Sequence, residues 1–453
     1  MNVVDILLPQ GEPTELPTIE PGERRAPPKA INVILPVWGY PFVRQFLEVG
    51  LPTLLAPGNL PTLAKALPCT FTLMTSEEDA EFVREHPAFH RLSSICPTEI
   101  RLMDHLITGS NYSTTLTLAY TEMVRAAGPA MLDTCFFFLV SDYIFADGSL
   151  ANVLARLLQG ASGVLVGNFQ VVQEDARIWL VEQLNASPHV LSLPPRPMMH
   201  WALAHLHPAT IANTVNYPLS HNIHTNRLFW RVDADTLIGR FYLMHMLVIR
   251  PETTQFTIGA SCDYSFVPEM CPSGAVEVIT DSDDYLVIEM QPREHESNFL
   301  RVGPLRPKAV AKTLSQWTTA RHRENANFSV IFHGSELSSR VAATRVEADS
   351  FIAEVGTRLR KTPQPHRGHR YWRGAIAAFN DATGQRLSAD EWHDVLNTSS
   401  VLPSDLLVQY LRFTLFGQTT RVRPWHPRWP DYRLISQRIE AVLADRNKRV
   451  LLA

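Results

Sequence analysis

Acidic side chains that directly follow a buried strand can hold a metal ion or move a proton. The run Cys135–Val140 is the most apolar of the sequence, and Asp142 and Asp147 come directly after it. Because ligands of open α/β sheets bind beyond the carboxyl ends of the strands, the Asp142 carboxylate would project into that crevice. Such oxygen ligands suit Mg²⁺ or Mn²⁺ bound together with substrate phosphates. The alternative is that Asp142 and Asp147 only fasten turns.

Two further acidic groups compete with Asp142. Asp233 and Asp235 have the literal Asp-x-Asp spelling, but the run before them is less apolar and Asp235 could cap a turn. The acids Asp281–Asp284 stand between two strand-like runs, Val276–Thr280 and Tyr285–Ile288, which favours a hairpin turn. Asp142 is therefore the preferred metal ligand.

Histidines are dense in the middle of the chain, where imidazoles could ligate a metal or bond to sugar hydroxyls. The residues concerned are His205, His207, His221, His224 and His245. The two close pairs could each bind a transition metal, although no His-Glu-x-x-His motif is present. Together with Asn222 and the flat ring of Trp230, His221 and His224 are expected to bind a hydroxyl acceptor. His245 lies in an apolar run, and it is either a core residue or a further ligand of the Asp142 metal.

A general base is sought among the later acids. Asp263 and Glu269 follow the histidine-rich stretch, and either could take a proton from an acceptor hydroxyl across the crevice. Each could equally be a surface or turn carboxylate.

Strand-like and helix-like segments alternate through the first two-thirds of the chain. Strands are expected at Ile31–Leu35, Thr70–Met74, Cys135–Val140 and Gly163–Gly167. Helical spacing runs from Phe42 to Leu55, and further helices are expected at Thr114–Ala127 and Leu150–Leu158. Ser76 and Ser149 are expected to cap helices. This alternation predicts an α/β fold with a mainly parallel sheet flanked by helices.

The 453 residues suggest more than one domain. Residues 1–29, rich in Pro and Glu, are expected to form a flexible arm, residues 30–303 the α/β domain, and residues 304–453 a mainly helical region. The net charge of −4 argues against nucleic acid as a partner. Five widely spaced cysteines, no signal-like start and no long apolar run favour a cytoplasmic protein without a membrane span. Peripheral membrane association and the oligomeric state stay open.

These residues resemble those of GT-A-type nucleotide-sugar glycosyltransferases over about residues 30–290. Val33–Trp38 is similar to the family's first strand and nucleotide-binding turn, Thr75–Asp79 to the end of its second strand, and Ser141–Tyr143 to its metal-binding Asp-x-Asp motif, although Ile144 replaces the second acid. The resemblance implies that Pro36, Trp38, Tyr40, Thr75 and Asp142 bind the donor. It also implies Mn²⁺ or Mg²⁺ on Asp142, with His245 as a second ligand, and a late base, which Asp263 or Glu269 would match.

The sequence therefore leads us to expect a glycosyltransferase that moves a sugar from a nucleotide-diphosphate donor to a hydroxyl acceptor. Two alternatives stay open: a non-catalytic α/β binding or scaffold module, and a His-ligated metal hydrolase. The donor, the acceptor and the stereochemical outcome cannot be read from residue spacing.

Overall fold

The computed structural model describes residues 25–107, 112–186, 189–221, 226–254, 256, 261–295, 300–315 and 318–360. The expectations for most of the N-terminal arm, for residues 361–453, and for Asn222 and His224 fall outside the described residues. The last part of the expected arm is anchored: the Arg25 guanidinium donates hydrogen bonds to four oxygens, among them the carbonyls of Leu132 and Arg250.

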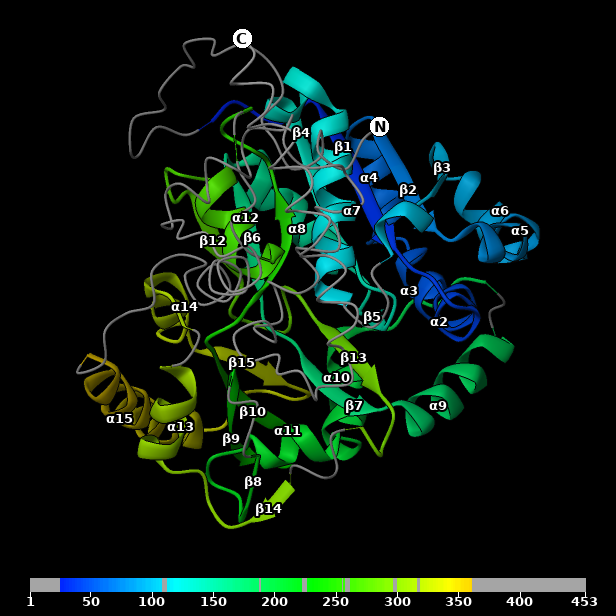
Figure 1. Cartoon of the computed structure of the whole chain (residues 1–453). Helices are drawn as coiled ribbons and strands as arrows, with labels where there is room; N and C mark the ends of the chain where they lie inside the picture. Colours follow the sequence, from blue (N-terminus) through cyan, green and yellow to red (C-terminus); the bar gives the residue numbers. More distant parts are fainter. Residues whose placement is uncertain are drawn as a thin grey trace, which may run out of the picture.

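A seven-stranded sheet forms the centre of the molecule (Figure 1). Its order is β12-β6-β11-β4-β1-β2-β3. The strands are β1 (Ala30–Pro36), β2 (Cys69–Thr75), β3 (Thr98–Leu102), β4 (Thr134–Phe138), β6 (Gly163–Val166), β11 (His245–Ile249) and β12 (Val276–Val278). Only β11 runs against its neighbours β4 and β6, so the prediction of a mainly parallel sheet is confirmed. The chain moves outward from β1 in both directions, which makes the carboxyl ends of β1 and β4 the topological switch point.

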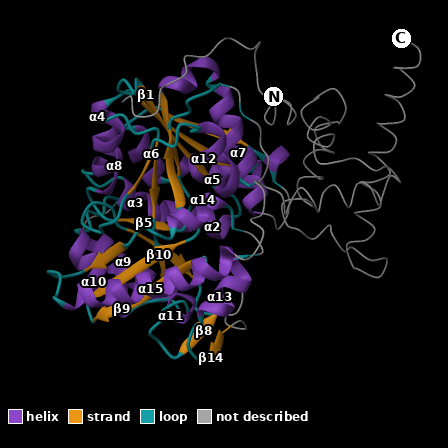
Figure 2. Cartoon of the chain, turned by 90° about the vertical axis from the view of Figure 1, so that its left-hand side faces the viewer, coloured by secondary structure: helices purple, strands orange, loops and turns teal. Residues whose placement is uncertain are grey.

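Helices cover both faces of this sheet (Figures 1 and 2). On one face, α7 (Tyr112–Ala126) and α12 (Cys262–Met270) pack on Phe136 and Phe138. On the other face, α4 (Leu60–Ala66), α5 (Glu77–Glu85), α6 (Pro87–Ser93) and α8 (Ser149–Leu158) share a core with Cys135 and Phe137. Successive side chains of a strand point to opposite faces, so β4 is apolar throughout because both of its faces are buried.

The helix expected between Phe42 and Leu55 contains a wider turn. It consists of α2 (Tyr40–Gln45), a π-helical turn at Phe46–Gly50, and α3 (Leu51–Leu54). A side-chain carbon at Gly50 would lie 3.2 Å from the Tyr143 carbonyl oxygen, so a larger residue would crowd the close approach of this helix to the segment after β4. The cap at Ser76 is confirmed, because its hydroxyl accepts from the Asp79 amide.

Three smaller sheets lie beside the central one (Figure 2). One has the order β5-β13-β7 and consists of β5 (Tyr143–Phe145), β13 (Val287–Gln291) and β7 (Phe169–Val172). Another has the order β15-β10-β9, with β15 (Val330–His333), β10 (Thr236–Phe241) and β9 (Arg227–Asp233). The third pairs β8 (Leu219–His221) with β14 (Leu300–Val302). The other helices here are α9 (Gln173–Ala186), α10 (Pro195–Ala204), α11 (Pro208–Ala212), α13 (Pro307–Leu314), α14 (Ala320–Asn325) and α15 (Arg340–Arg360).

Three sequence-based expectations are corrected by this arrangement. Strands β12 and β13 belong to different sheets, so Asp281–Asp284 is a link between sheets and not a hairpin turn. Residues on both sides of 304 share one core, because β15 pairs with β10 and α13 and α15 pack around Trp230. Gly148, at φ 93°, precedes α8 as its N-cap, whereas the Ser149 hydroxyl donates to the Leu286 carbonyl.

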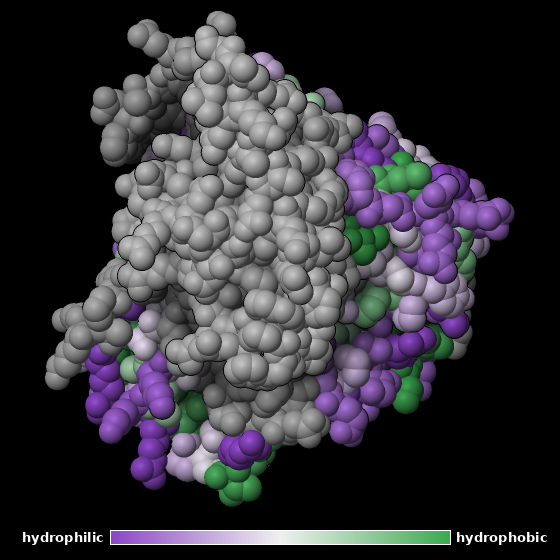
Figure 3. Space-filling model, in the orientation of Figure 1, coloured by the Kyte–Doolittle hydropathy of each residue, from purple (hydrophilic) through white to green (hydrophobic). Residues whose placement is uncertain are grey.

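No helix of the described ranges is long and apolar enough to cross a bilayer. In the view of Figure 3, hydrophilic residues predominate on the described surface at the right, where Figure 1 places α5 and α6, and hydrophobic residues form only small patches there.

Trp230→Ala is expected to lower the free energy of unfolding by about 3–5 kcal/mol, because the indole is completely buried between β9 and α15. Val346→Ala on the exposed side of α15 should change it by less than about 0.5 kcal/mol. Urea unfolding of both variants measures the difference. Equal effects of the two substitutions would contradict a core role for Trp230.

Candidate functional site

Asp142 stands where the chain leaves β4 and enters β5, beside the switch point of the central sheet. Its backbone carbonyl accepts a hydrogen bond from the Met290 amide at 3.0 Å, and its Oδ2 accepts one from Gln291 Nε2 at 3.2 Å. The side chain is half-buried. The placement expected from the sequence, beyond the carboxyl end of the phenylalanine-rich strand, is therefore what the structure has.

A polar cluster surrounds Asp142, and strand register builds it. Glu289 of β13 lies directly opposite Tyr143 of β5 and Gln170 of β7. The Glu289 carboxylate accepts from Gln170 Nε2 at 2.7 Å and from Gln291 Nε2 at 3.0 Å. Gln291 therefore donates to both Glu289 and Asp142, which brings two carboxylates to one amide.

One arginine compensates the charge of this cluster. Arg227, the first residue of β9, pairs with Glu289 at 2.9 Å, and both side chains are less than one-fifth exposed. Arg227 also donates to Asn168 Oδ1, and Asn168 Nδ2 donates to the Tyr143 hydroxyl at 2.9 Å. Three segments far apart in sequence, which carry Asn168, Arg227 and Glu289, thus converge on Tyr143, the residue next to Asp142.

The two carboxylates have opposite pKa shifts. Burial alone would raise the pKa of Glu289, but Arg227 and the amide donors outweigh it and keep that pKa below its usual value. Burial, and secondly the charge of Glu289, raise the pKa of Asp142 to about 8. Two acids with one arginine leave a negative charge uncompensated when both are ionised, and a divalent cation would supply that compensation.

His245 begins β11 at the same end of the central sheet. Its Nε2 lies 2.8 Å from the Phe138 carbonyl oxygen and must carry the proton, because a carbonyl only accepts. Burial lowers the pKa of His245 to about 4, so the ring is neutral and Nδ1 keeps its lone pair. The ring centre is 5.2 Å from that of Tyr143, which places His245 beside the Asp142 segment.

Asp263 lies on the other face of β11. With His322, Arg321 and Asn325 of α14 it lines a small pocket that also includes Met246. Met246 is opposite Leu165 in the α12-covered core, while His245 is opposite Val166 in the core of the other face. Asp263 therefore lies in a pocket of its own. The printed contacts of His245 are with Phe138 and Tyr143 rather than with Asp142, so the shared cleft of Asp142, His245 and Asp263 stays a prediction.

Asp263 and Asp142 are both close enough to Tyr120 for their charges to act on its hydroxyl group. The Tyr120 hydroxyl donates to the Leu139 carbonyl at 2.7 Å. Burial raises the pKa of Tyr120 well above its usual value, and the charges of Asp263 and Asp142 add to this. Burial raises the pKa of Asp263 itself to about 6. Glu269 lies six residues further along α12, which is about 1.7 turns, so it points away from the face that carries Asp263.

The expected donor-binding residues cluster at the ends of β1 and β2. Pro36 ends β1 and is buried, whereas Trp38 is partly exposed and Tyr40 largely exposed. The Gly39 amide donates to Asp79 Oδ2 at 2.7 Å, which fixes this turn to the start of α5. Thr75 ends β2 but is fully buried, and its hydroxyl has no hydrogen-bond partner among the described residues.

The expected acceptor surface is not formed by Trp230, which is a core residue. A sugar cannot stack on an indole that has no exposed surface. His221 ends β8, on the small sheet with β14. His207 is committed to structure: its Nδ1 accepts from the Ala209 amide and its Nε2 faces the Pro292 carbonyl. His205 stacks on Trp201 and pairs with Asp175, so these two histidines do not form a zinc pair.

The competing acids have structural partners. Asp147 accepts from the Gly58 amide and the Ser192 hydroxyl, as expected for a residue that fastens a loop. Asp233 and Asp235 form the turn between β9 and β10, where Asp233 Oδ1 accepts from the Asp235 amide.

Sequence reasoning missed the side chains around Asp142, and it missed the histidine that joins Asp281 and Asp283. Arg227, Glu289 and Gln291 carry no motif, and only the alternation of β13 could have directed Glu289 and Gln291 to one face. Asp281, Asp283 and His333 form a group that can hold a metal ion, the only such group among the described residues.

Comparison with protein families found no matching family model, and a search of curated proteins found no similar sequence.

Arg227→Met is expected to lower the free energy of unfolding by about 3–5 kcal/mol, because it leaves Glu289 buried without its counter-ion. Arg358→Met, at an exposed pair with Glu354, should cost less than about 1 kcal/mol. Adding Glu289→Gln to Arg227→Met should restore most of the loss. If the double variant is no more stable than Arg227→Met, the ion pair does not hold the cluster together.

Proposed function

We propose that the protein transfers a sugar from a nucleotide-diphosphate donor to a hydroxyl acceptor, with the donor bound across the carboxyl ends of β1 and β4. The observation that supports this proposal is the position of Asp142 at the switch point of a mainly parallel sheet, with His245 beside the neighbouring residue Tyr143. Ligands of open α/β sheets bind at such a point.

The donor diphosphate would be held through a divalent cation. Asp142 would offer a carboxylate that loses its proton on binding the cation, because burial raises its pKa to about 8, and His245 would offer a neutral nitrogen. Two protein ligands suit Mg²⁺ or Mn²⁺, which complete their coordination with substrate phosphates and water. The bound ion would neutralise the diphosphate as it leaves.

The nucleotide would lie over the turn after β1. Trp38 offers a partly exposed ring next to Tyr112, with the ring centres 5.8 Å apart, and Tyr40 is exposed one turn further on. Both can stack on a base. Thr75 is closed to solvent, so it would act through the backbone of β2 rather than by direct contact.

Asp263 is the proposed general base, because its pocket opens at the same sheet end and burial brings its pKa to about 6. A base with this pKa is ionised at neutral pH and still accepts a proton readily. Glu269 is left out of this role because α12 turns it away.

Donor binding is the first test of the proposal. In thermal unfolding with Mn²⁺ and UDP-, GDP- or CDP-sugars, donors of one nucleotide class should raise the melting temperature. Asp142→Asn should abolish the shift, because it removes the charge that holds the cation. Asp147→Asn, in the same segment, should keep it. No shift with any donor would instead support the non-catalytic binding module.

The pH dependence of transfer tests the base. Asp263 acts when ionised, so kcat/KM should fall as the pH drops below about 6 and level off above it. Asp263→Asn should lower kcat by about 10²–10⁴-fold and leave donor affinity unchanged. An Asp263→Asn enzyme with wild-type kcat would remove Asp263 from the reaction.

A further inference from the structure

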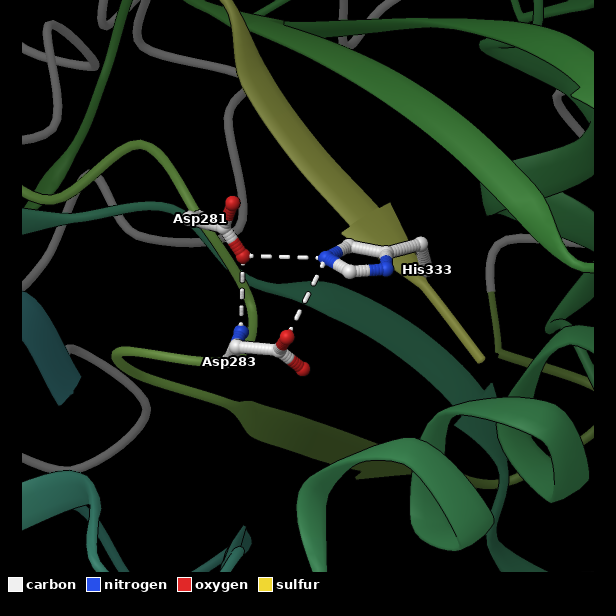
Figure 4. A group of neighbouring side chains, drawn as sticks. All are labelled: Asp281, Asp283 and His333. Atoms are coloured by element: carbon white, nitrogen blue, oxygen red, sulfur yellow. Dashed lines mark hydrogen bonds and ion pairs between the residues drawn. The ribbon is translucent and has the colours of Figure 1, made fainter. Parts of the chain in front are cut away.

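Asp281, Asp283 and His333 meet at the junction between the central sheet and the β15-β10-β9 sheet (Figure 4). Asp281 and Asp283 belong to the link that follows β12, and His333 is the last residue of β15. The link and β15 are joined by backbone hydrogen bonds, from the Ile331 amide to Thr280 and from the Ser282 amide to Ile331. The three side chains are therefore fixed by two strands that come from distant parts of the sequence.

The orientation of the His333 ring is fixed by a hydrogen bond at Nδ1. Nδ1 lies 2.8 Å from the Ser335 carbonyl oxygen, which can only accept, so Nδ1 carries a proton. Nε2 points between the carboxylates, 3.0 Å from Asp281 Oδ1 and 3.7 Å from Asp283 Oδ2. The ring is buried, while both carboxylates are partly exposed. This is how metal-binding histidines are commonly held, with the second ring nitrogen donating to a carbonyl.

The two separations from His333 Nε2 are close to those between ligands of one metal ion. Ligands at about 2.0–2.2 Å from a tetrahedral zinc are about 3.3–3.6 Å apart. The two separations from Nε2, 3.0 and 3.7 Å, lie on either side of that range. One imidazole with two carboxylates suits zinc better than Mg²⁺ or Ca²⁺, which prefer all-oxygen sites.

We propose that Asp281, Asp283 and His333 bind one Zn²⁺ ion, which ties the link after β12 to β15. Three protein ligands leave a fourth position for water, on the partly exposed side of the carboxylates. The site is separate from Asp142 and its proposed Mg²⁺ or Mn²⁺, and it does not depend on sugar transfer.

Arg196 competes with the ion for one ligand. Its guanidinium donates to both oxygens of Asp283, at 3.0–3.2 Å, and it also pairs with Glu336. Zinc binding requires Asp283 Oδ2 to turn from Arg196 toward the ion. Arg196→Met should therefore strengthen zinc binding.

Calorimetric titration of the chelator-treated full chain with ZnCl₂ tests the site. One Zn²⁺ per chain should bind, and His333→Asn should weaken binding by about 100-fold or more, since even residues behind the ligands contribute about 10–100-fold. Asp281→Asn should weaken zinc binding to a similar extent. Asp284→Asn, in the same link but paired with Arg156, should bind zinc as the wild type does. Excess Mg²⁺ should not compete.

Zinc should also raise the melting temperature of the wild type and of Asp142→Asn, but not of His333→Asn. The comparison with Asp142→Asn separates the zinc site from the donor site. The melting temperature measured without zinc shows whether His333→Asn is still folded. If the wild type binds no zinc, or if His333→Asn and Asp281→Asn bind it unchanged, the three residues are only an ion-paired cluster and the proposal is wrong.

Discussion

The buried pair of Arg227 and Glu289 is the interaction on which the arrangement around Asp142 depends. Glu289 is brought beside Asp142 by the register of β5 and β13, and without a counter-ion the buried Glu289 and the half-buried Asp142 would repel each other when both are ionised. Arg227 commits its charge to Glu289, and Gln291 donates to both acids. Asp142 is therefore the acid of this cluster without an ion pair among the described residues, at the sheet end where an open α/β fold binds ligands. Charge compensation and strand topology both favour Asp142 as the ligand-binding residue.

Strands β1, β2, β4 and β6 of the central sheet could be predicted because their sequence is dominated by burial. β1, β2 and β4 are short apolar runs, and both faces of β4 pack into cores. The cap at Ser76 and the position of Asp142 follow from local signals of the same kind. These features depend on residues close together in the sequence, which is why residue patterns are enough to find them.

The errors concern contacts between distant residues. The link at Asp281–Asp284 has the composition of a turn, but composition does not tell which sheet each flanking strand joins. Trp230 was assigned to a sugar surface because residue type alone cannot separate a buried indole from an exposed one. The partner of Asp281 is His333, 52 residues further along the chain, so no local pattern could join them.

The two proposed cation sites differ in their chemistry. The site at Asp142 would be shared with the phosphates of a ligand, while the site at His333 would be supplied mainly by the protein and would join two sheets. Both lie at places where segments distant in sequence come together, so both depend on the whole described fold.

The most direct measurement is anomalous diffraction from crystals soaked with Mn²⁺ and a nucleotide-sugar. The account predicts a manganese peak within bonding distance of Asp142, in contact with the donor diphosphate at the carboxyl ends of β1 and β4. A nucleotide bound elsewhere, or an Asp142 carboxylate that still bonds only to Gln291 in the liganded crystal, would contradict it.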